Sequence, residues 1–399
     1  MYKLYCRVYQ KVFLLVSNFL PWRKPELLEG ASSLLRLPKL LKRNNISKTL
    51  IVTDAVIVSL GLMDKLLAGL EKEGIEYHIY DKTVPNPTVG NIEEALTIYR
   101  RNKCNGIIAF GGGSPMDCAK GVACRVARPD KNISQLRGVL KVRKKTPTLI
   151  AVPTTAGTGS ETTLAAVISN PKTHEKYAIN DPVLIPSYAV LDPTITTGLP
   201  PHITSTTGMD ALTHAVEAYI GKSNTKETKR MAVKATQLIF KNIETAYSEG
   251  NNLIARGEMQ KASFYAGVAF TRAYVGYVHA VAHTLGGFYG TPHGLANAVI
   301  LPYVLELYGT SAHRALAELA DAVGITESSE PIEVKADKFM KAIKKLNRDM
   351  NIPDKITGIQ EKDIPQMVDR AYKEGNPLYP VPRIMSKKEL TEIYYLIKA

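Results

Sequence analysis

The sequence predicts an α/β region built on a parallel sheet, followed by an all-helical region. Two observations support this order: strand-like and helix-like segments alternate from residue 49 to 152, and alanine-rich segments with a helical period follow after about Leu199. With 399 residues, of which 45% are hydrophobic and 22% charged, the chain has an ordinary globular composition and is long enough for two domains.

The alternating segments are short apolar runs separated by amphipathic stretches. Such alternation requires crossover helices, which implies parallel strands with helices on both faces of the sheet. The predicted strands are Thr49–Thr53, Tyr77–Tyr80, Gly106–Phe110 and Thr148–Val152, and the predicted helices between them are Leu62–Glu73, Val89–Arg101 and Pro115–Arg125.

The second half contains helical patterns and no strand pattern of comparable quality. We place the boundary in Asp192–Pro201, which is rich in proline and glycine. The predicted organisation is an N-terminal extension over residues 1–30, an α/β domain over 31–198 and a helical domain over 199–399. The predicted helices are Gly208–Ile220, Lys226–Tyr247, Ile254–Phe270 and Val278–Gly286, with further helices from Ala312 onward.

The predicted extension begins with an amphipathic helix. Five apolar residues share one helical face: Leu4, Val8, Val12, Leu15 and Phe19. Three basic residues lie on another face: Lys3, Arg7 and Lys11. The apolar run is far shorter than the roughly 20 residues that span a bilayer. Two interpretations remain open: residues 1–24 contact a membrane surface, or the helix packs on its own protein or on a second subunit.

The formal net charge of +14 would attract anions. No zinc-finger or RNA-binding motif accompanies this charge, so we interpret it as a solvated basic surface and predict no nucleic-acid partner. The cysteines form no C-x-x-C pair and are expected to be reduced thiols in a cytoplasmic protein, without a thiolate metal site. They are Cys6, Cys104, Cys118 and Cys124.

Two loops after predicted strands have the composition of a phosphate cradle. Gly111–Ser114 separates a strand from a helix, so its backbone and the helix N-terminus suit a diphosphate, although a tight turn explains the glycines equally well. Pro153–Ser160 follows the next strand and is rich in threonine and glycine. Asp54 ends the first strand, where it would bind a ribose diol and favour NAD over NADP, or cap a helix.

Metal-ligand side chains recur at helical spacing in the second half. Asp210 and His214 are four residues apart, as are His279 and His283, and His293 follows. This spacing places each pair on one helical face. Neutral imidazoles with a carboxylate suit Fe²⁺ or Zn²⁺, so the set predicts a metal site.

These motifs resemble the iron-containing (group III) alcohol dehydrogenases between about Leu50 and Pro302. The resemblance implies a dinucleotide-binding α/β domain followed by an all-α metal-binding domain, an architecture shared with dehydroquinate synthases. Four segments carry it: Gly111–Asp117, Pro153–Glu161, Gly208–Glu217 and Gly276–Pro302.

The resemblance also implies the role of each site residue. His283 would lie beside the metal as a proton-relay residue. The implied metal ligands are Asp210, His214, His279 and His293. The implied cofactor-binding residues are Asp54, Gly111, Gly112, Gly113, Ser114, Asp117, Thr154, Thr155, Thr158 and Lys176.

The implied activity is hydride transfer between a primary or small alcohol or aldehyde and NAD(H), with Fe²⁺ as the metal and Zn²⁺ as the alternative. A homodimer in the cytoplasm is the expected form. Two other functions remain open on the same fold, a polyol dehydrogenase and a hydroxyacid–oxoacid transhydrogenase. An alternative of another class is a membrane-surface scaffold with a vestigial site.

Overall fold

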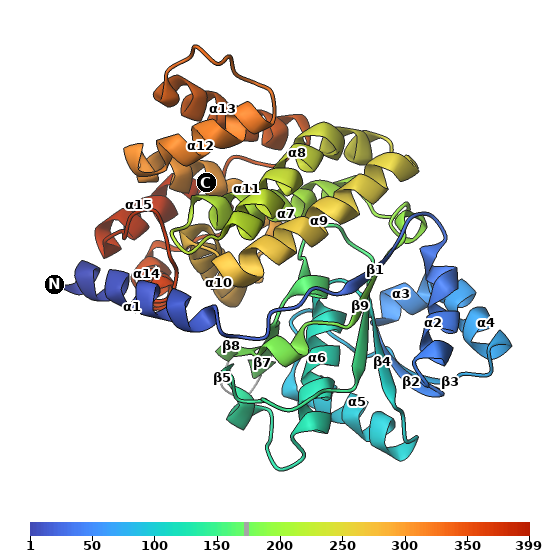
Figure 1. The fold of residues 1–399 in the computed structure, drawn as a ribbon. Helices are drawn as coiled ribbons and strands as arrows, with labels where there is room; N and C mark the ends of the chain where they lie inside the picture. Colours follow the sequence, from blue (N-terminus) through green and yellow to red (C-terminus); the bar gives the residue numbers. More distant parts are fainter. Residues whose placement is uncertain (171–174) are drawn as a thin grey trace. The chain divides into compact units, whose positions relative to one another are not determined.

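The computed structural model describes residues 1–170 and 175–399 and contains two compact units (Figure 1). One unit, the α/β unit, is Pro21–Gly198. The other, the helical unit, combines Met1–Leu20 with Leu199–Ala399. Within the described residues, no helix has both the length and the apolarity needed to cross a membrane.

A six-stranded, fully parallel sheet forms the centre of the α/β unit, with strand order β1-β9-β6-β4-β2-β3. A smaller sheet has the order β5-β8-β7, in which β7 and β8 are antiparallel. The predicted α/β fold with a parallel sheet is therefore confirmed. The strands are β1 (Glu26–Glu29), β2 (Lys48–Val52), β3 (Glu76–Tyr80), β4 (Gly106–Gly111), β5 (Gly138–Val139), β6 (Thr148–Pro153), β7 (Ala165–Asn170), β8 (Glu175–Asn180) and β9 (Tyr188–Leu191).

Helices cover both faces of the large sheet, and each face has its own core. Leu50 and Val52 of β2 belong to the core that packs under α5 and α6, whereas Ile51 points to the core under α2 and α4. Burial on both faces explains why the strands read as continuous apolar runs. The helices of this unit are α2 (Leu37–Arg43), α3 (Ala55–Ser59), α4 (Asp64–Lys72), α5 (Val89–Arg101) and α6 (Gly113–Ala127).

Two strands of the large sheet, β1 and β9, lie outside the sequence prediction. β1 has a glutamate at each end and only Leu28 is buried, so it lacks the apolar run that marks the other strands. β1 pairs with β9 along its whole length. This pairing places residues 21–30, assigned above to the N-terminal extension, in the α/β unit.

The helical unit is organised around α7 (Pro201–Ile220), in which every residue from Gly208 to Ile220 is buried. The predicted all-helical region is confirmed. The other helices are α1 (Tyr2–Ser17), α8 (Lys226–Ser248), α9 (Leu253–Ala273), α10 (Tyr277–Tyr289), α11 (His293–Tyr308), α12 (Thr310–Ala322), α13 (Ile332–Asp349), α14 (Ile364–Gly375) and α15 (Lys387–Ile397).

Helix α1 packs on the helical unit through a narrow stripe that contains Cys6, Gln10 and Ser17. The Gln10 side-chain amide donates to the carbonyl oxygen of Tyr379 at 2.7 Å, and the Arg7 guanidinium donates to the carbonyl oxygen of Val381 at 2.8 Å. Packing on its own protein, one of the two interpretations left open, is therefore present, but it uses a different face. The five apolar residues that define the predicted face are all exposed.

The close approach of α6 to α5 generates a stability prediction. A Cβ atom at Gly121 would collide with Cδ1 of Ile92, which is completely buried. We expect Gly121→Ala to lower the free energy of unfolding by about 1–3 kcal/mol, measured by urea denaturation. The control is Gly90→Ala on α5, where a Cβ atom would meet only Thr88 Oγ1 at 3.4 Å. Equal stability of the two variants would contradict this packing.

Candidate metal centre and cofactor loops

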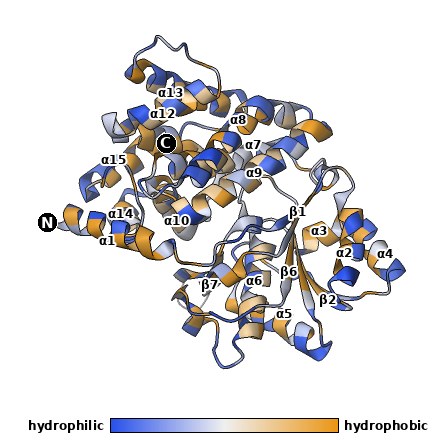
Figure 2. Cartoon of the chain, viewed as in Figure 1, coloured by the Kyte–Doolittle hydropathy of each residue, from blue (hydrophilic) through white to orange (hydrophobic). Residues whose placement is uncertain are grey.

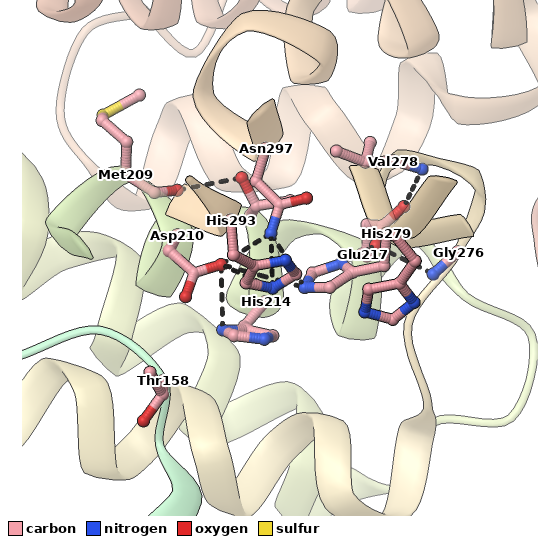
Figure 3. Close-up of polar contacts among 12 residues, drawn as sticks. Thr158, Met209, Asp210, His214, Glu217, Gly276, Val278, His279, His293 and Asn297 are labelled. Atoms are coloured by element: carbon pink, nitrogen blue, oxygen red, sulfur yellow. Dashed lines mark hydrogen bonds and ion pairs between the residues drawn. The ribbon is translucent and has the colours of Figure 1, made fainter. Parts of the chain in front are cut away.

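The four predicted metal ligands come together in the helical unit (Figure 3). Their ligand atoms all lie within 4.8 Å of one another. Asp210 Oδ1 is 3.9 Å from His214 Nδ1, 3.9 Å from His279 Nε2 and 3.6 Å from His293 Nε2. Donors bound to one cation at about 2.0–2.2 Å lie only slightly closer together than this. The set therefore fits a divalent cation with a small inward adjustment.

Three helices supply these side chains. Asp210 and His214 lie one turn apart on α7, His279 is in the first turn of α10, and His293 is the first residue of α11. The first three are buried, whereas 41% of the His293 side chain is exposed. Because α7 is buried along this stretch, it provides a rigid base for two of the ligands.

Asn297, one turn after His293 on α11, lies at the centre of the cluster. Its side-chain amide donates to Asp210 Oδ1 at 2.6 Å and lies 3.2 Å from His279 Nε2. It also lies 3.1 Å from His293 Nε2. Three of the four ligand atoms therefore face the amide nitrogen of Asn297.

Glu217, two turns after Asp210 on α7, fixes the orientation of His279. The buried Glu217 carboxylate lies 2.6 Å from His279 Nδ1. It also accepts hydrogen bonds from the backbone N–H groups of Gly276 and Val278, both at 2.8 Å. A side chain at position 276 would collide with this carboxylate, since its Cβ would lie 2.7 Å from Glu217 Oε1. Glycine therefore permits the contact.

Electrostatics favour a neutral His279 ring. Burial, together with the neighbouring imidazoles of His214, His293 and His283, holds the pKa of His279 well below its ordinary value. A proton on Nδ1 donates to Glu217, which leaves the Nε2 lone pair directed at the cluster. Burial raises the pKa of Glu217 to about 7, against the lowering effect of the amides that it accepts from. A cation at the cluster would favour the carboxylate form.

His283 lies beside the cluster, one turn after His279. Its ring stacks on that of His293, with centroids 5.3 Å apart, and 40% of its side chain is exposed. Its Nδ1 lies 2.6 Å from Glu374 Oε1, and the Tyr379 hydroxyl donates to the same oxygen at 2.8 Å. His283, Glu374 and Tyr379 thus form a hydrogen-bonded series of titratable groups that begins beside the cluster.

The predicted cofactor loops lie next to each other at the carboxyl ends of β4 and β6. The Thr154 amide donates to the Gly111 carbonyl oxygen at 3.1 Å, and a Cβ at Gly113 would touch Thr158. Gly111 has a φ of +147°, and its Cβ would lie 2.6 Å from Pro115. No side chain caps α6, which begins at Gly113. This glycine-lined helix N-terminus fits the phosphates of a dinucleotide.

The loop after β6 is held by a buried lysine of α6, Lys120. Its ammonium donates to the carbonyl oxygens of Ser160 and Ala165 at 2.7 and 2.9 Å. Burial lowers the pKa of Lys120 to about 8, and burial raises the pKa of nearby Asp117 to about 6. Asp117 accepts from the Ser160 hydroxyl at 3.3 Å, so it contacts this loop through the same residue.

Two other predicted cofactor residues make hydrogen bonds within the α/β unit. The Asp54 carboxylate accepts from the Ile57 amide at 3.1 Å and caps α3, which is the structural interpretation considered above. Lys176 on β8 donates to Asn86 Oδ1 at 2.9 Å.

Several residues of these sites had no predicted role. Glu217 and Asn297 share a helical face with predicted ligands, at positions i+7 from Asp210 and i+4 from His293, and this spacing was available from the sequence. Lys120 was detectable as a charged residue among the small and apolar residues 118–124 of the predicted helix. Glu374 carried no such signal, because it is 91 residues from His283.

The Glu217 contacts predict the response of metal binding to a neutral substitute. Glu217→Gln places an amide against two N–H donors and removes the charged partner of His279. We expect the metal dissociation constant to rise about 10–100-fold, measured by competition with a chelator. Glu318→Gln, which changes a carboxylate that accepts from the Tyr219 hydroxyl, is the control. Unchanged affinity in a folded Glu217→Gln protein would exclude this orienting role.

Both units match models of known protein families. Residues 25–193 match the family model described as iron-containing alcohol dehydrogenase. Residues 204–397 match the one described as Fe-containing alcohol dehydrogenase family, C-terminal. Alcohol dehydrogenase 4 of Schizosaccharomyces pombe is 41% identical over 88% of this chain and 83% of its own length. The 1,3-propanediol dehydrogenase of Klebsiella pneumoniae is 40% identical over 87% of this chain and 90% of its own length.

Solved structures agree with these matches. A 1,3-propanediol oxidoreductase superimposes with a TM-score of 0.91 at 37% identity, covering 94% of this chain and 99% of the other. A sulfoacetaldehyde reductase from Bifidobacterium kashiwanohense in complex with NAD⁺ gives a TM-score of 0.84 at 28% identity, covering 95% of this chain and 98% of the other. The resemblance inferred from the motifs is confirmed: the chain belongs to the iron-containing alcohol dehydrogenase family.

Proposed function

We propose that this protein transfers a hydride between a small primary alcohol or aldehyde and NAD(H), with Fe²⁺ as its metal and Zn²⁺ as the alternative. The convergence of Asp210, His214, His279 and His293 carries the proposal. The names of the relatives support the substrate class, since they include an alcohol dehydrogenase and a 1,3-propanediol dehydrogenase. When bound, the metal supplies a Lewis acid for the alcohol oxygen and NAD⁺ supplies the hydride acceptor.

The residues of the helical unit would hold and orient the metal. Asp210 contributes the negative charge and the three histidines contribute neutral donors. Glu217 keeps His279 oriented, and a bound cation would take over the three donors that the Asn297 amide now contacts. A complete and supported ligand set argues against the vestigial scaffold, because such a protein has no physical need for it.

The residues of the α/β unit would bind the dinucleotide. Gly111, Gly112, Gly113 and Ser114 would approach the diphosphate, with Asp117, Thr154, Thr155, Thr158 and Lys176 around it. The Asp54 carboxylate would accept from the ribose diol through the oxygen that does not cap α3, and its charge would disfavour NADP.

His283 would carry the proton between the reacting oxygen and solvent. Its exposed ring lies beside His293, and Glu374 fixes the ring through Nδ1, which leaves Nε2 for the exchanged proton. Tyr379 in turn holds Glu374.

We further propose that the enzyme acts in the cytoplasm as a homodimer, with residues 1–24 in contact with a membrane surface. The same site would also serve a polyol dehydrogenase or a hydroxyacid–oxoacid transhydrogenase. A transhydrogenase would interconvert its substrates without releasing NADH, which distinguishes it from the proposed dehydrogenase.

The first test is an activity screen of protein stripped of metal by a chelator and then reloaded with Fe²⁺ or Zn²⁺. We expect NADH formation from ethanol or 1,3-propanediol to require the metal, and NADP⁺ to be a poorer acceptor than NAD⁺. Asp210→Asn protein treated identically is the control and should stay inactive. Turnover that survives stripping, or no turnover with any alcohol and either metal, would overturn the proposal.

The second test addresses the proton relay. We expect His283→Ala to lower kcat by about 10²–10⁴-fold and to change its pH dependence, with metal content unchanged. Glu374→Gln retains the imidazole and should lose less activity. If His283→Ala keeps the wild-type rate and pH profile, the proton leaves by another route.

A further inference from the structure

Helix α1 presents an uncovered apolar face to solvent. Its most exposed members are Phe19, just beyond the helix, at 89%, Leu4 at 69% and Leu15 at 63%, with Val8 and Val12 between them. With 3.6 residues per turn, these positions lie opposite the stripe of Cys6, Gln10 and Ser17 that packs on the helical unit. Among the described residues of the helical unit, no element covers this face. Figure 2 shows the hydrophobic residues along α1.

The borders of this face have the character of a helix at a membrane interface. Exposed Lys11 lies along one border, and Tyr5 and Tyr9 lie along the other, whereas exposed Lys3 and Tyr2 lie farther round the helix, nearer the packed stripe. Residues 1–24 contain no aspartate or glutamate and end in Trp22-Arg23-Lys24. Amphipathic aromatic rings and basic side chains are the groups that prefer lipid headgroups.

The helix is firmly attached, so its outward face is a fixed surface of the helical unit. Arg7 and Gln10 bind carbonyl oxygens in segment 377–382. Tyr2 stacks on Tyr372 of α14, with ring centroids 5.9 Å apart. Because the helix is already folded and held on the helical unit, binding through this face does not cost the conformational entropy of ordering the chain.

We infer that the outward face of α1 binds an anionic lipid bilayer, with its apolar residues at the acyl boundary and Lys11 at the phosphates, while Lys3 adds positive charge farther round the helix. This inference deepens the membrane contact proposed for residues 1–24 and is independent of the dehydrogenase activity. The charge of the helix favours lipid over a second copy of the chain. Residues 1–24 are basic and contain no acidic residue, so anionic lipid has the complementary charge. A second copy that docked through the same face would bring only the same positive charge.

The test is co-sedimentation of the full chain with vesicles of phosphatidylcholine, with or without phosphatidylserine. We expect binding to the anionic vesicles, weaker binding to neutral vesicles and loss of binding with added salt. The double variant Leu15→Glu/Phe19→Glu should bind at least tenfold more weakly. Ile254→Glu, the same change at a 78% exposed residue of α9, is the matched control and should bind like wild type.

A second variant separates charge from apolar adhesion. Lys3→Gln/Lys11→Gln should reduce binding to anionic vesicles only. Alcohol turnover is measured for every variant, so that a membrane result and a catalytic result stay distinct. The inference is overturned if wild type ignores anionic vesicles, or if Leu15→Glu/Phe19→Glu binds them equally well. Self-association in sedimentation velocity that Leu15→Glu/Phe19→Glu abolishes, without vesicle binding, would assign the face to a second copy.

Discussion

Three hydrogen bonds to one buried carboxylate hold the start of α10 against α7. Glu217 receives two backbone amides and the ring of His279, and it belongs to the same helix as Asp210 and His214. A single carboxylate therefore sets both the position of α10 and the rotation of its histidine. A buried carboxylate without hydrogen-bond partners is energetically costly. The three donors therefore stabilise Glu217, and Glu217 in turn positions them. The orientation of His279 in the candidate metal cluster depends on these hydrogen bonds.

In the α/β unit a buried positive charge, the ammonium of Lys120, has a comparable structural role. Lys120 is completely buried, and its ammonium is surrounded by carbonyl and hydroxyl oxygens from the loop after β6. That loop has little apolar content of its own and cannot be held by packing. The buried ammonium of Lys120 holds the loop in place, because each oxygen that faces it would otherwise need a hydrogen bond from water. In each unit a buried ionic group supports a loop or helix start that carries polar residues of that unit's predicted site.

The sequence was informative where physical constraints are local. Hydrophobic period and turn residues predicted the central strands and most helices, and the i, i+4 pairs predicted which segments supply Asp210, His214 and His279. It was uninformative where partners are far apart in the chain. The contact of Glu374 with His283 joins positions 91 residues apart, and no pattern within either helix indicates it. β1 was missed because an edge strand with two glutamates has little apolar content. The packed face of α1 was missed because Cys6, Gln10 and Ser17 are not conspicuously hydrophobic.

The attachment of α1 has a practical consequence for how the protein is handled. Its side chains satisfy the carbonyl oxygens of Pro377, Tyr379, Val381 and Pro382, in the segment whose tyrosine holds Glu374. A version shortened at its N-terminus to improve solubility would expose these oxygens and loosen the support of His283. Trimming the apolar end of this chain thus also alters the unit that carries the candidate metal ligands.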